Sequence, residues 1–156
     1  MQIKELMSTD IIKIPGTTSL LDAAKLMKKH NIGFIPVTDQ DVAVGVITDR
    51  DIVLALAKDQ KTDIKVSSFM TKNVKTLKPE DKIEVLHELM GRYQIKRVLV
   101  TDANQKLAGV VSLADIARRK HLEETAQEIL IEITDDPSKK IESNGQRGVK
   151  VDDFPL

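Results

Sequence analysis

Two short strings of the sequence carry the same potential binding chemistry. Residues 45–51 (GVITDRD) and 109–115 (GVVSLAD) each contain a glycine, two β-branched apolar residues, a hydroxyl residue and, three positions after the hydroxyl, an aspartate. The hydroxyl and carboxylate residues are Thr48 and Asp51 in the first string, and Ser112 and Asp115 in the second. This spacing is typical of a capping box, in which both side chains bind free N–H groups at the start of a helix. Taken alone, each string is best explained as the start of a helix.

The same residue types also suit a nucleotide. The free N–H groups and the positive dipole end of a helix start favour a phosphate, and Thr48 or Ser112 would add a hydroxyl donor. An ionised aspartate accepts hydrogen bonds only, so it can bind both hydroxyls of a ribose. Gly45 and Gly109 would keep backbone exposed for close approach of a ligand. Each string therefore fits either a capped helix alone or one half of a nucleotide site.

The two strings occupy matching places in an internal repeat. With an offset of 63 residues, Met70 corresponds to Met7, and the match continues for more than thirty residues. One additional residue in a turn of the second copy then changes the offset to 64. We assign residues 1–62 to repeat 1, residues 63–122 to repeat 2, and residues 123–156 to a helical extension and a polar C-terminal tail.

Each repeat has the periodicity of strand, helix, strand, strand and helix, an α/β (α+β) pattern. In repeat 1 these elements are expected at residues 11–14, 20–27, 33–37, 42–47 and 51–57, with Thr18 or Ser19 capping the first helix. In repeat 2 they are expected at residues 74–77, 82–93, 96–100, 106–112 and 114–122. Helices on one face of a sheet leave the other face exposed, so we expect the two repeats to pack through their sheets.

The last helix is predicted to be long. Apolar residues recur at helical spacing from Ile116 through Leu122, Ala126 and Ile129 or Leu130 to Ile133, which favours one helix from about Ala114 that packs on the body or on a partner chain. The polar residues that follow are predicted to form a loosely ordered tail. Its apolar end could dock elsewhere through Val149, Val151, Phe154 and Leu156.

Composition limits the possible functions. The 24 basic and 24 acidic residues cancel, which argues against nucleic acid or an anionic membrane as a partner. Cysteine is absent, which fits a reducing compartment and excludes thiol chemistry. The sequence has neither a signal peptide nor a run of roughly 18 apolar residues, so we expect a cytoplasmic protein.

Catalytic and metal-binding patterns are weak. We find no P-loop and no Ser-His-Asp pattern, so we do not expect an enzyme. His30, His87 and His121 do not share a helix at ligand spacing, so we expect no metal site. The pair Asp49 and Asp51 could hold Mg²⁺ together with nucleotide phosphates, although capping and ribose contacts explain these residues more simply.

The duplicated unit resembles a known family. An IPV strand (residues 35–37) followed by G-h-h-[ST]-x-x-D, where h is apolar, resembles the CBS domain, and the tandem pair over residues 1–122 resembles a Bateman module. The resemblance implies pseudo-twofold packing of the repeats through their sheets, two clefts for adenosine-containing ligands, and a homodimer. It also implies a sensing role, in which the ligand biases a conformation that a partner protein reads.

The resemblance further implies a role for individual residues. Ribose would bind Asp51 and Asp115, and phosphates would lie by Thr48, Ser112, Arg50, Lys96 and Arg97. Adenine would lie against Ile35 and Pro36 in one cleft and Val98 and Leu99 in the other, with backbone near Ile12 or Lys75 reading its edge. The two copies differ, because repeat 2 has Lys96 and Arg97 where repeat 1 has Gly33 and Phe34.

The sequence therefore predicts a non-enzymatic sensor that requires no cofactor. Its regulatory ligand would be AMP, ADP, ATP, S-adenosylmethionine or cyclic di-AMP, and Mg²⁺ could bind together with the ligand. The sensor would act on an unknown regulated protein. The alternative is a protein-interaction scaffold with empty clefts. A nucleotide-dependent enzyme is a weaker third hypothesis.

Overall fold

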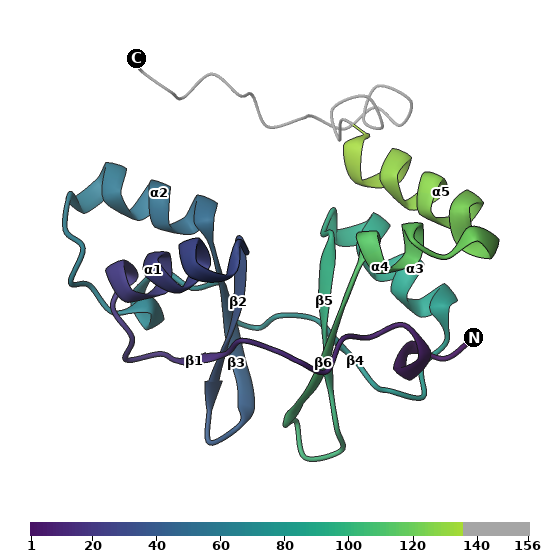
Figure 1. Cartoon of the computed structure of the whole chain (residues 1–156), viewed down its shortest axis with the longest axis horizontal. Helices are drawn as coiled ribbons and strands as arrows, with labels where there is room; N and C mark the ends of the chain where they lie inside the picture. Colours follow the sequence, from purple (N-terminus) through teal and green to yellow (C-terminus); the bar gives the residue numbers. More distant parts are fainter. Residues whose placement is uncertain (136–156) are drawn as a thin grey trace, which may run out of the picture.

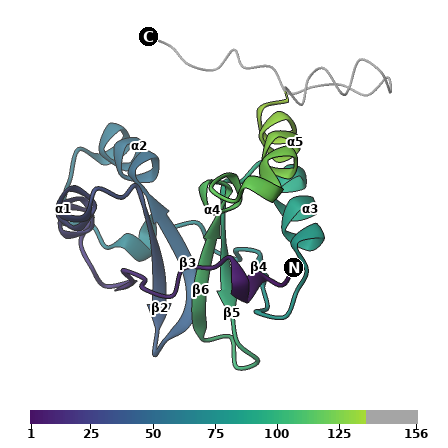
Figure 2. The same cartoon turned by 45° about the vertical axis from the view of Figure 1, so that its right-hand side comes forward.

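Two three-stranded sheets lie side by side in the centre of the molecule, with the helices on their outer faces (Figures 1 and 2). The computed structural model describes residues 1–135. The mixed α/β class and the two expected repeats are confirmed. The predicted tail from residue 136 onward, with its apolar end, lies outside the described residues.

Repeat 1 forms one sheet with two helices. Its elements are β1 (Ile14–Pro15), α1 (Leu20–His30), β2 (Phe34–Asp39), β3 (Val42–Thr48) and α2 (Asp49–Asp59). The strand order is β1-β2-β3, with β1 parallel and β3 antiparallel to the central strand. Ser19, rather than Thr18, caps α1, because its hydroxyl accepts a hydrogen bond from the Asp22 N–H at 3.0 Å.

Repeat 2 forms the second sheet with the same topology. Its elements are β4 (Thr76–Leu77), α3 (Ile83–Tyr93), β5 (Arg97–Thr101), β6 (Leu107–Ser112) and α4 (Leu113–Ala117). The order is β4-β5-β6, again with one parallel and one antiparallel pairing. A 3₁₀ turn, η3 (Lys120–Leu122), and the helix α5 (Glu123–Thr134) follow.

The prediction of one long final helix is wrong. The backbone of Arg119 is extended (φ −97°, ψ 108°), which ends the helical path that began at Leu113. The resulting change of direction places Ala126 and Ile129 in the core of repeat 2, where α5 packs on α3 and α4. The expectation that this segment packs back on the body is confirmed.

Side chains alternate along the strands between two environments. Ile35 and Val37 of β2 lie in the core beneath α1 and α2, and Val98 and Val100 of β5 lie in the core beneath α3 and α5. Leu99, on the opposite face of β5, is also buried. The two inner faces therefore meet between the sheets, as the packing argument predicted.

Two short segments cross between the repeats. The N-terminal segment (residues 1–8) packs on repeat 2, where Ile3 is fully buried in the core and the Ser8 N–H donates to the Val110 carbonyl at 2.8 Å. The linker segment (residues 64–71) packs on repeat 1, where Val66 is fully buried. Each repeat of the sequence is thus completed by a segment from outside its own helices and strands.

Described helices are too short or too polar to cross a membrane: no helix within residues 1–135 has the length and apolarity that a span needs.

Candidate ligand cleft

Both strings of the repeated motif form capping boxes. Oδ2 of Asp51 accepts a hydrogen bond from the Thr48 N–H at 2.9 Å, and the Asp51 N–H donates to the Thr48 hydroxyl at 3.2 Å. In repeat 2 the Asp115 Oδ2 accepts from the Ser112 N–H at 2.8 Å, and the Asp115 N–H donates to the Ser112 hydroxyl at 3.3 Å. The motif therefore starts α2 and α4, as the local interpretation predicts.

Capping does not use the whole carboxylate. Oδ1 of Asp51 has no hydrogen-bond or ion-pair partner within residues 1–135, and Oδ1 of Asp115 accepts from Nη1 of Arg118 at 3.2 Å. The Arg118 side chain is 75% exposed, so it is free to share or leave this contact. Capping the helix and binding a ligand hydroxyl are therefore compatible roles for one aspartate.

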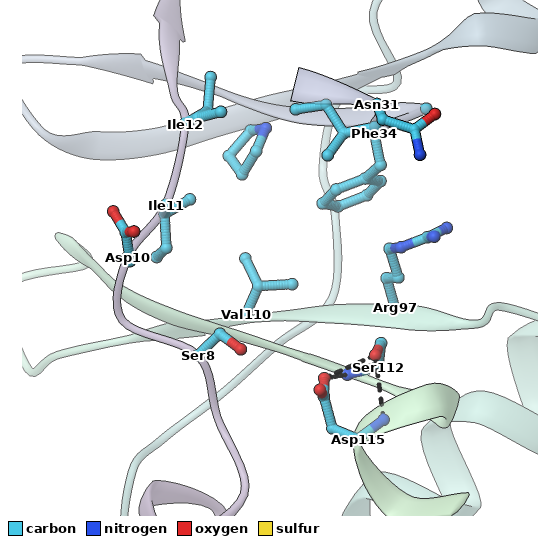
Figure 3. A pocket seen from close by; sticks show the side chains of 13 residues that line it. Ser8, Asp10, Ile11, Ile12, Asn31, Phe34, Arg97, Val110, Ser112 and Asp115 are labelled. Atoms are coloured by element: carbon cyan, nitrogen blue, oxygen red, sulfur yellow. Dashed lines mark hydrogen bonds between the residues drawn. The ribbon is translucent and has the colours of Figure 1, made fainter. Parts of the chain in front are cut away.

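A cleft of about 310 Å³ lies between the repeats beside the motif of repeat 2 (Figure 3). We call it the Asp115 cleft. Three stretches of chain form its walls: the residues before β1, the end of α1 with the start of β2, and the strands β5 and β6 with the start of α4. The lining residues are Ser8, Asp10, Ile11, Ile12, Asn31, Ile32, Gly33, Phe34, Pro36, Arg97, Val110, Ser112 and Asp115.

The two sides of the Asp115 cleft differ in chemistry. Ile12 and Pro36 come from repeat 1 and offer apolar side chains, whereas Ser112 and Asp115 come from repeat 2 and offer a hydroxyl and a carboxylate. Figure 3 shows Ile12 on the side of the cleft opposite Ser112 and Asp115. A ligand that places a flat apolar ring against Ile12 and Pro36 and a hydroxylated ring against Ser112 and Asp115 would match this division. The arrangement can therefore hold a nucleoside.

Arg97 stands at the meeting point of the two repeats. Its guanidinium lies 5.7 Å from the centre of the Phe34 ring, a cation–π contact across the repeats. The two residues occupy equivalent positions, because 97 − 34 = 63 is the repeat offset. Within residues 1–135, Arg97 is the only cationic residue that lines the cleft.

Other predicted site residues lie elsewhere. Ile35 and Val98 face the helices within the two cores, so the structure does not bring their side chains into the Asp115 cleft. Leu99 is buried between the sheets. The cleft lining also does not include Thr48, Arg50, Asp51, Lys75 and Lys96.

The motif glycines serve packing. A Cβ on Gly109 would lie 2.6 Å from the Met7 sulfur, and one on Gly45 would lie 2.7 Å from the Thr71 carbonyl oxygen and 2.8 Å from the Met70 sulfur. Both glycines are buried by the crossing segments. The expectation that they expose backbone for a ligand is therefore wrong, since a methionine and backbone of the same chain occupy that space.

Several lining residues were missed by sequence reasoning. Ser8 and Asp10 precede the first strand, and Asn31 ends α1 with a left-handed backbone (φ 52°). None of them belongs to the repeated motif. Ser8 and Asp10 reach the cleft because the N-terminal segment crosses to repeat 2, and the residue pattern contained no signal of that crossing.

A second cavity within residues 1–135 has a different lining. This more open cavity of about 430 Å³ between α3 and α5 is lined by Glu84, His87, Glu88, Gly91, Arg92 and Glu132, with His87 Nε2 3.5 Å from Glu132 Oε1. No cluster of three or more His, Cys, Asp or Glu residues within residues 1–135 is arranged to hold a metal ion.

Comparison with known proteins gives a consistent result. The model of the CBS domain matches residues 3–58 and again residues 66–121. The CBS domain-containing protein YhcV of Bacillus subtilis (strain 168) is 36% identical over 135 residues, which cover 85% of this chain and 94% of YhcV. The L-aspartate semialdehyde sulfurtransferase of Methanocaldococcus jannaschii is 34% identical over 117 residues, but these are only 22% of that enzyme.

Solved structures show the same architecture. The CBS domain pair of protein MJ0100, in complex with 5′-methylthioadenosine and S-adenosyl-L-methionine, superposes with a TM-score of 0.69 at 34% identity, covering 76% of this chain and 94% of that one. The CBS domain protein PAE2072 of Pyrobaculum aerophilum, complexed with AMP, gives a TM-score of 0.73 at 24% identity, covering 81% and 98%. This chain belongs to the CBS domain family, as a tandem pair of CBS domains.

Proposed function

We propose that this chain is a regulatory sensor that binds an adenosyl ligand in the Asp115 cleft. The observation that carries the proposal is the cleft itself, which joins the carboxylate and hydroxyl of repeat 2 to the apolar wall of repeat 1. Adenine lies against Ile12 and Pro36, the ribose hydroxyls bind Asp115, and the 5′ substituent extends toward Ser112 and Arg97. The adenosyl ligands bound by the CBS pair of MJ0100, at 34% identity, support this class of ligand.

A second site follows from the repeat. Thr48 and Asp51 form the same capping box as Ser112 and Asp115, so we propose that they bind a second ligand with Arg50 and Lys96 at its phosphates. Leu99 and the backbone near Lys75 contact its adenine, with Ile35 and Val98 supporting the two adenine slots from the cores. Mg²⁺ would accompany only a phosphorylated ligand.

A matched pair of substitutions tests the Asp115 cleft. Asp115→Asn removes an ionised acceptor from the cleft, while Asp51→Asn makes the same change in the equivalent capping box outside it. A hydrogen bond to a charged group contributes about 1.5–3 kcal/mol. Asp115→Asn should therefore raise the dissociation constant of the ligand in the Asp115 cleft by about tenfold or more. Asp51→Asn should leave the affinity of the Asp115 cleft unchanged. It serves as the control for the loss of helix capping, which both variants share.

Isothermal titration with AMP, ADP, ATP, S-adenosylmethionine, 5′-methylthioadenosine and cyclic di-AMP, each with and without Mg²⁺, measures these affinities. The proposal is wrong if no ligand binds at millimolar concentration, or if Asp115→Asn binds as tightly as the wild type. The first outcome would favour an interaction scaffold with empty clefts.

We further propose that occupancy is passed to a separate regulated protein and that this chain performs no catalysis. The ligand would touch both repeats, so it can bias their relative position. Ser8, Asp10, Ile11 and Ile12 form part of the cleft wall, and Ser8 also pairs with Val110 of repeat 2. Ligand binding should therefore slow hydrogen exchange in residues 8–12, and unchanged exchange there would contradict transmission through this wall.

We also propose a homodimer. Leu21 of α1 and Val53 and Leu54 of α2 are 44%, 64% and 49% exposed, and they leave apolar side chains on the outer helices of repeat 1. Light scattering should give twice the chain mass of 17.4 kDa, and Val53→Asp should shift it toward one chain. A monomeric wild type would refute the dimer.

A further inference from the structure

The charge of the Asp115 cleft points to a class of ligand within the proposed function, on which this inference rests. The lining contains two carboxylates, Asp10 and Asp115, and a single cation, Arg97. Arg118 contacts Asp115 from outside the lining, and this pairing partly offsets the negative charge. The cleft therefore has no excess positive charge to offer a polyphosphate.

Arg97 is also only partly available. Its guanidinium lies on the Phe34 ring and its side chain is exposed to water, so its attraction for an anion is screened. A triphosphate placed beside Asp10 and Asp115 would carry several negative charges against this one cation. Like charges held close together repel, so Asp10 and Asp115 oppose the binding of a polyphosphate here.

The equivalent positions around the motif of repeat 1 have the opposite character. At the offset of 63, Asn73, Lys75 and Lys96 correspond to Asp10, Ile12 and Gly33, so a carboxylate is lost and two cations are gained. At the offset of 64, Asp49 and Arg50 correspond to Leu113 and Ala114, so these two positions add one charge of each sign and the net gain comes from Lys75 and Lys96. The surroundings of Thr48 and Asp51 are therefore more positively charged than the Asp115 cleft.

The helices that start at the two motifs also differ in length. The motif of repeat 1 starts α2, which has 11 residues, whereas the motif of repeat 2 starts α4, which has 5 residues. A short helix presents a weaker dipole to an anion. Length and side-chain charge therefore agree in making the Asp115 cleft the poorer site for phosphate.

We infer that the Asp115 cleft selects adenosyl ligands whose 5′ substituent is uncharged or cationic, such as a thioether or a sulfonium, over adenosine di- and triphosphates. The apolar wall and Asp115 bind the adenosine that all these ligands share. The carboxylates and the Phe34 ring favour a sulfonium, because a cation is attracted to both. Selection therefore comes from the unfavourable charge of a polyphosphate.

Competition between ligands tests the inference. The Asp51→Asn/Asp115→Asn double variant identifies, by its loss, the binding that belongs to the Asp115 cleft. Isothermal titration is then carried out on the Asp51→Asn variant, in which binding at the motif of repeat 1 is weakened. In this variant 5′-methylthioadenosine and S-adenosylmethionine should bind at least about tenfold more tightly than Mg²⁺-free ATP. ATP binding as tightly as the thioether would overturn the inference while leaving the proposed function intact.

A charge added at Gly33 gives a second, matched test. A Cβ at this position would lie 2.5 Å from Oδ2 of Asp49, the end of an exposed and flexible side chain, so Gly33→Lys and Gly33→Gln need the same small movement. Gly33→Lys supplies the cation that repeat 2 has at Lys96.

The measured quantity is the ratio of the ATP and 5′-methylthioadenosine dissociation constants. Gly33→Lys should shift this ratio toward ATP by about fivefold or more, and Gly33→Gln should leave it unchanged. An equal ratio in both variants would overturn the inference. If neither ligand binds to any variant, both the inference and the proposed function fail.

Discussion

Each motif aspartate caps a helix with one carboxylate oxygen and leaves the other for a further contact. In Asp51 that second oxygen has no partner within residues 1–135, and in Asp115 it meets the exposed Arg118. The capping bonds also fix the carboxylate in place before a ligand arrives. Under the proposed function, a ligand would meet an acceptor whose orientation is already determined by the backbone of its own helix.

Replacing each motif glycine by alanine should lower the stability of the protein by different amounts. In Gly45→Ala the new Cβ would meet the backbone oxygen of Thr71 at 2.7 Å, whereas in Gly109→Ala it would meet the Met7 side chain, which can rotate. Overpacking costs about 1–3 kcal/mol, and we expect Gly45→Ala to lie at the upper end and Gly109→Ala at the lower. Urea unfolding of the two variants measures the difference. Equal losses would mean that Met7 cannot move.

At the scale of elements, the hairpin turn between β2 and β3 is tied to the chain before β1. Nζ of Lys13 donates a hydrogen bond to Oδ1 of Asp41 at 2.5 Å. This bond, together with the charge of Lys13, lowers the pKa of Asp41 below its ordinary value of 3.8. The ion pair joins two segments that are far apart in the sequence.

The contribution of the Lys13–Asp41 ion pair to the stability of the folded state should fall as the pH falls. A carboxylate whose pKa falls on folding stabilises the folded state above its unfolded pKa, and this stabilisation is lost as the pH falls through the folded pKa. Lys13→Met should therefore lower stability slightly at neutral pH, since both side chains are exposed, and the difference from wild type should vanish in strong acid. Urea unfolding at both pH values provides the measurement. A difference that survives in acid would have to come from packing of the Lys13 stem.

The crossing segments should stabilise the repeat on which they pack. Ile3 and Val66 are equivalent in the two copies, both are fully buried, and each lies in the core of the repeat that its segment crosses to. Ile3→Ala should cost about 2–5 kcal/mol and Val66→Ala somewhat less, because fewer methyl groups are removed.

Hydrogen exchange locates the effect of each variant. Ile3→Ala should accelerate exchange first in α3 and α5, and Val66→Ala first in α1 and α2. If Ile3→Ala instead loosened α1 and α2, the N-terminal segment would belong to repeat 1 in solution.

At the scale of the whole molecule, reciprocal exchange of segments joins the two repeats. Each core contains a buried residue from a segment that continues directly into the other repeat's sheet. Unfolding one repeat therefore removes part of the other. We predict a single calorimetric transition whose van't Hoff and calorimetric enthalpies agree. Two resolved transitions would show that the crossing segments contribute little to coupling.

Ligand binding should act on this joined unit. A ligand that binds only the folded form raises the melting temperature with its concentration. Because the Asp115 cleft has walls from both repeats, the single transition should shift as a whole.

The features that the sequence determined by itself are local. The capping boxes link residues three positions apart, the strands follow from alternation, and the hairpins connect neighbouring runs, so each could be read from a short window. The duplication made these local signals specific, because the motif recurred in the same place in two copies. This was enough to predict the CBS pair and the capping roles of Asp51 and Asp115.

Only the tertiary structure decided which residues share a cleft. Ile12 and Pro36 of repeat 1 meet Ser112 and Asp115 of repeat 2, while Ile35, the neighbour of Pro36, faces the helices. The bend at Arg119, the crossing of the N-terminal segment and the methionine over each motif glycine were likewise not readable from periodicity. Such features depend on contacts between residues far apart in the sequence, and these form only when the two sheets pack together.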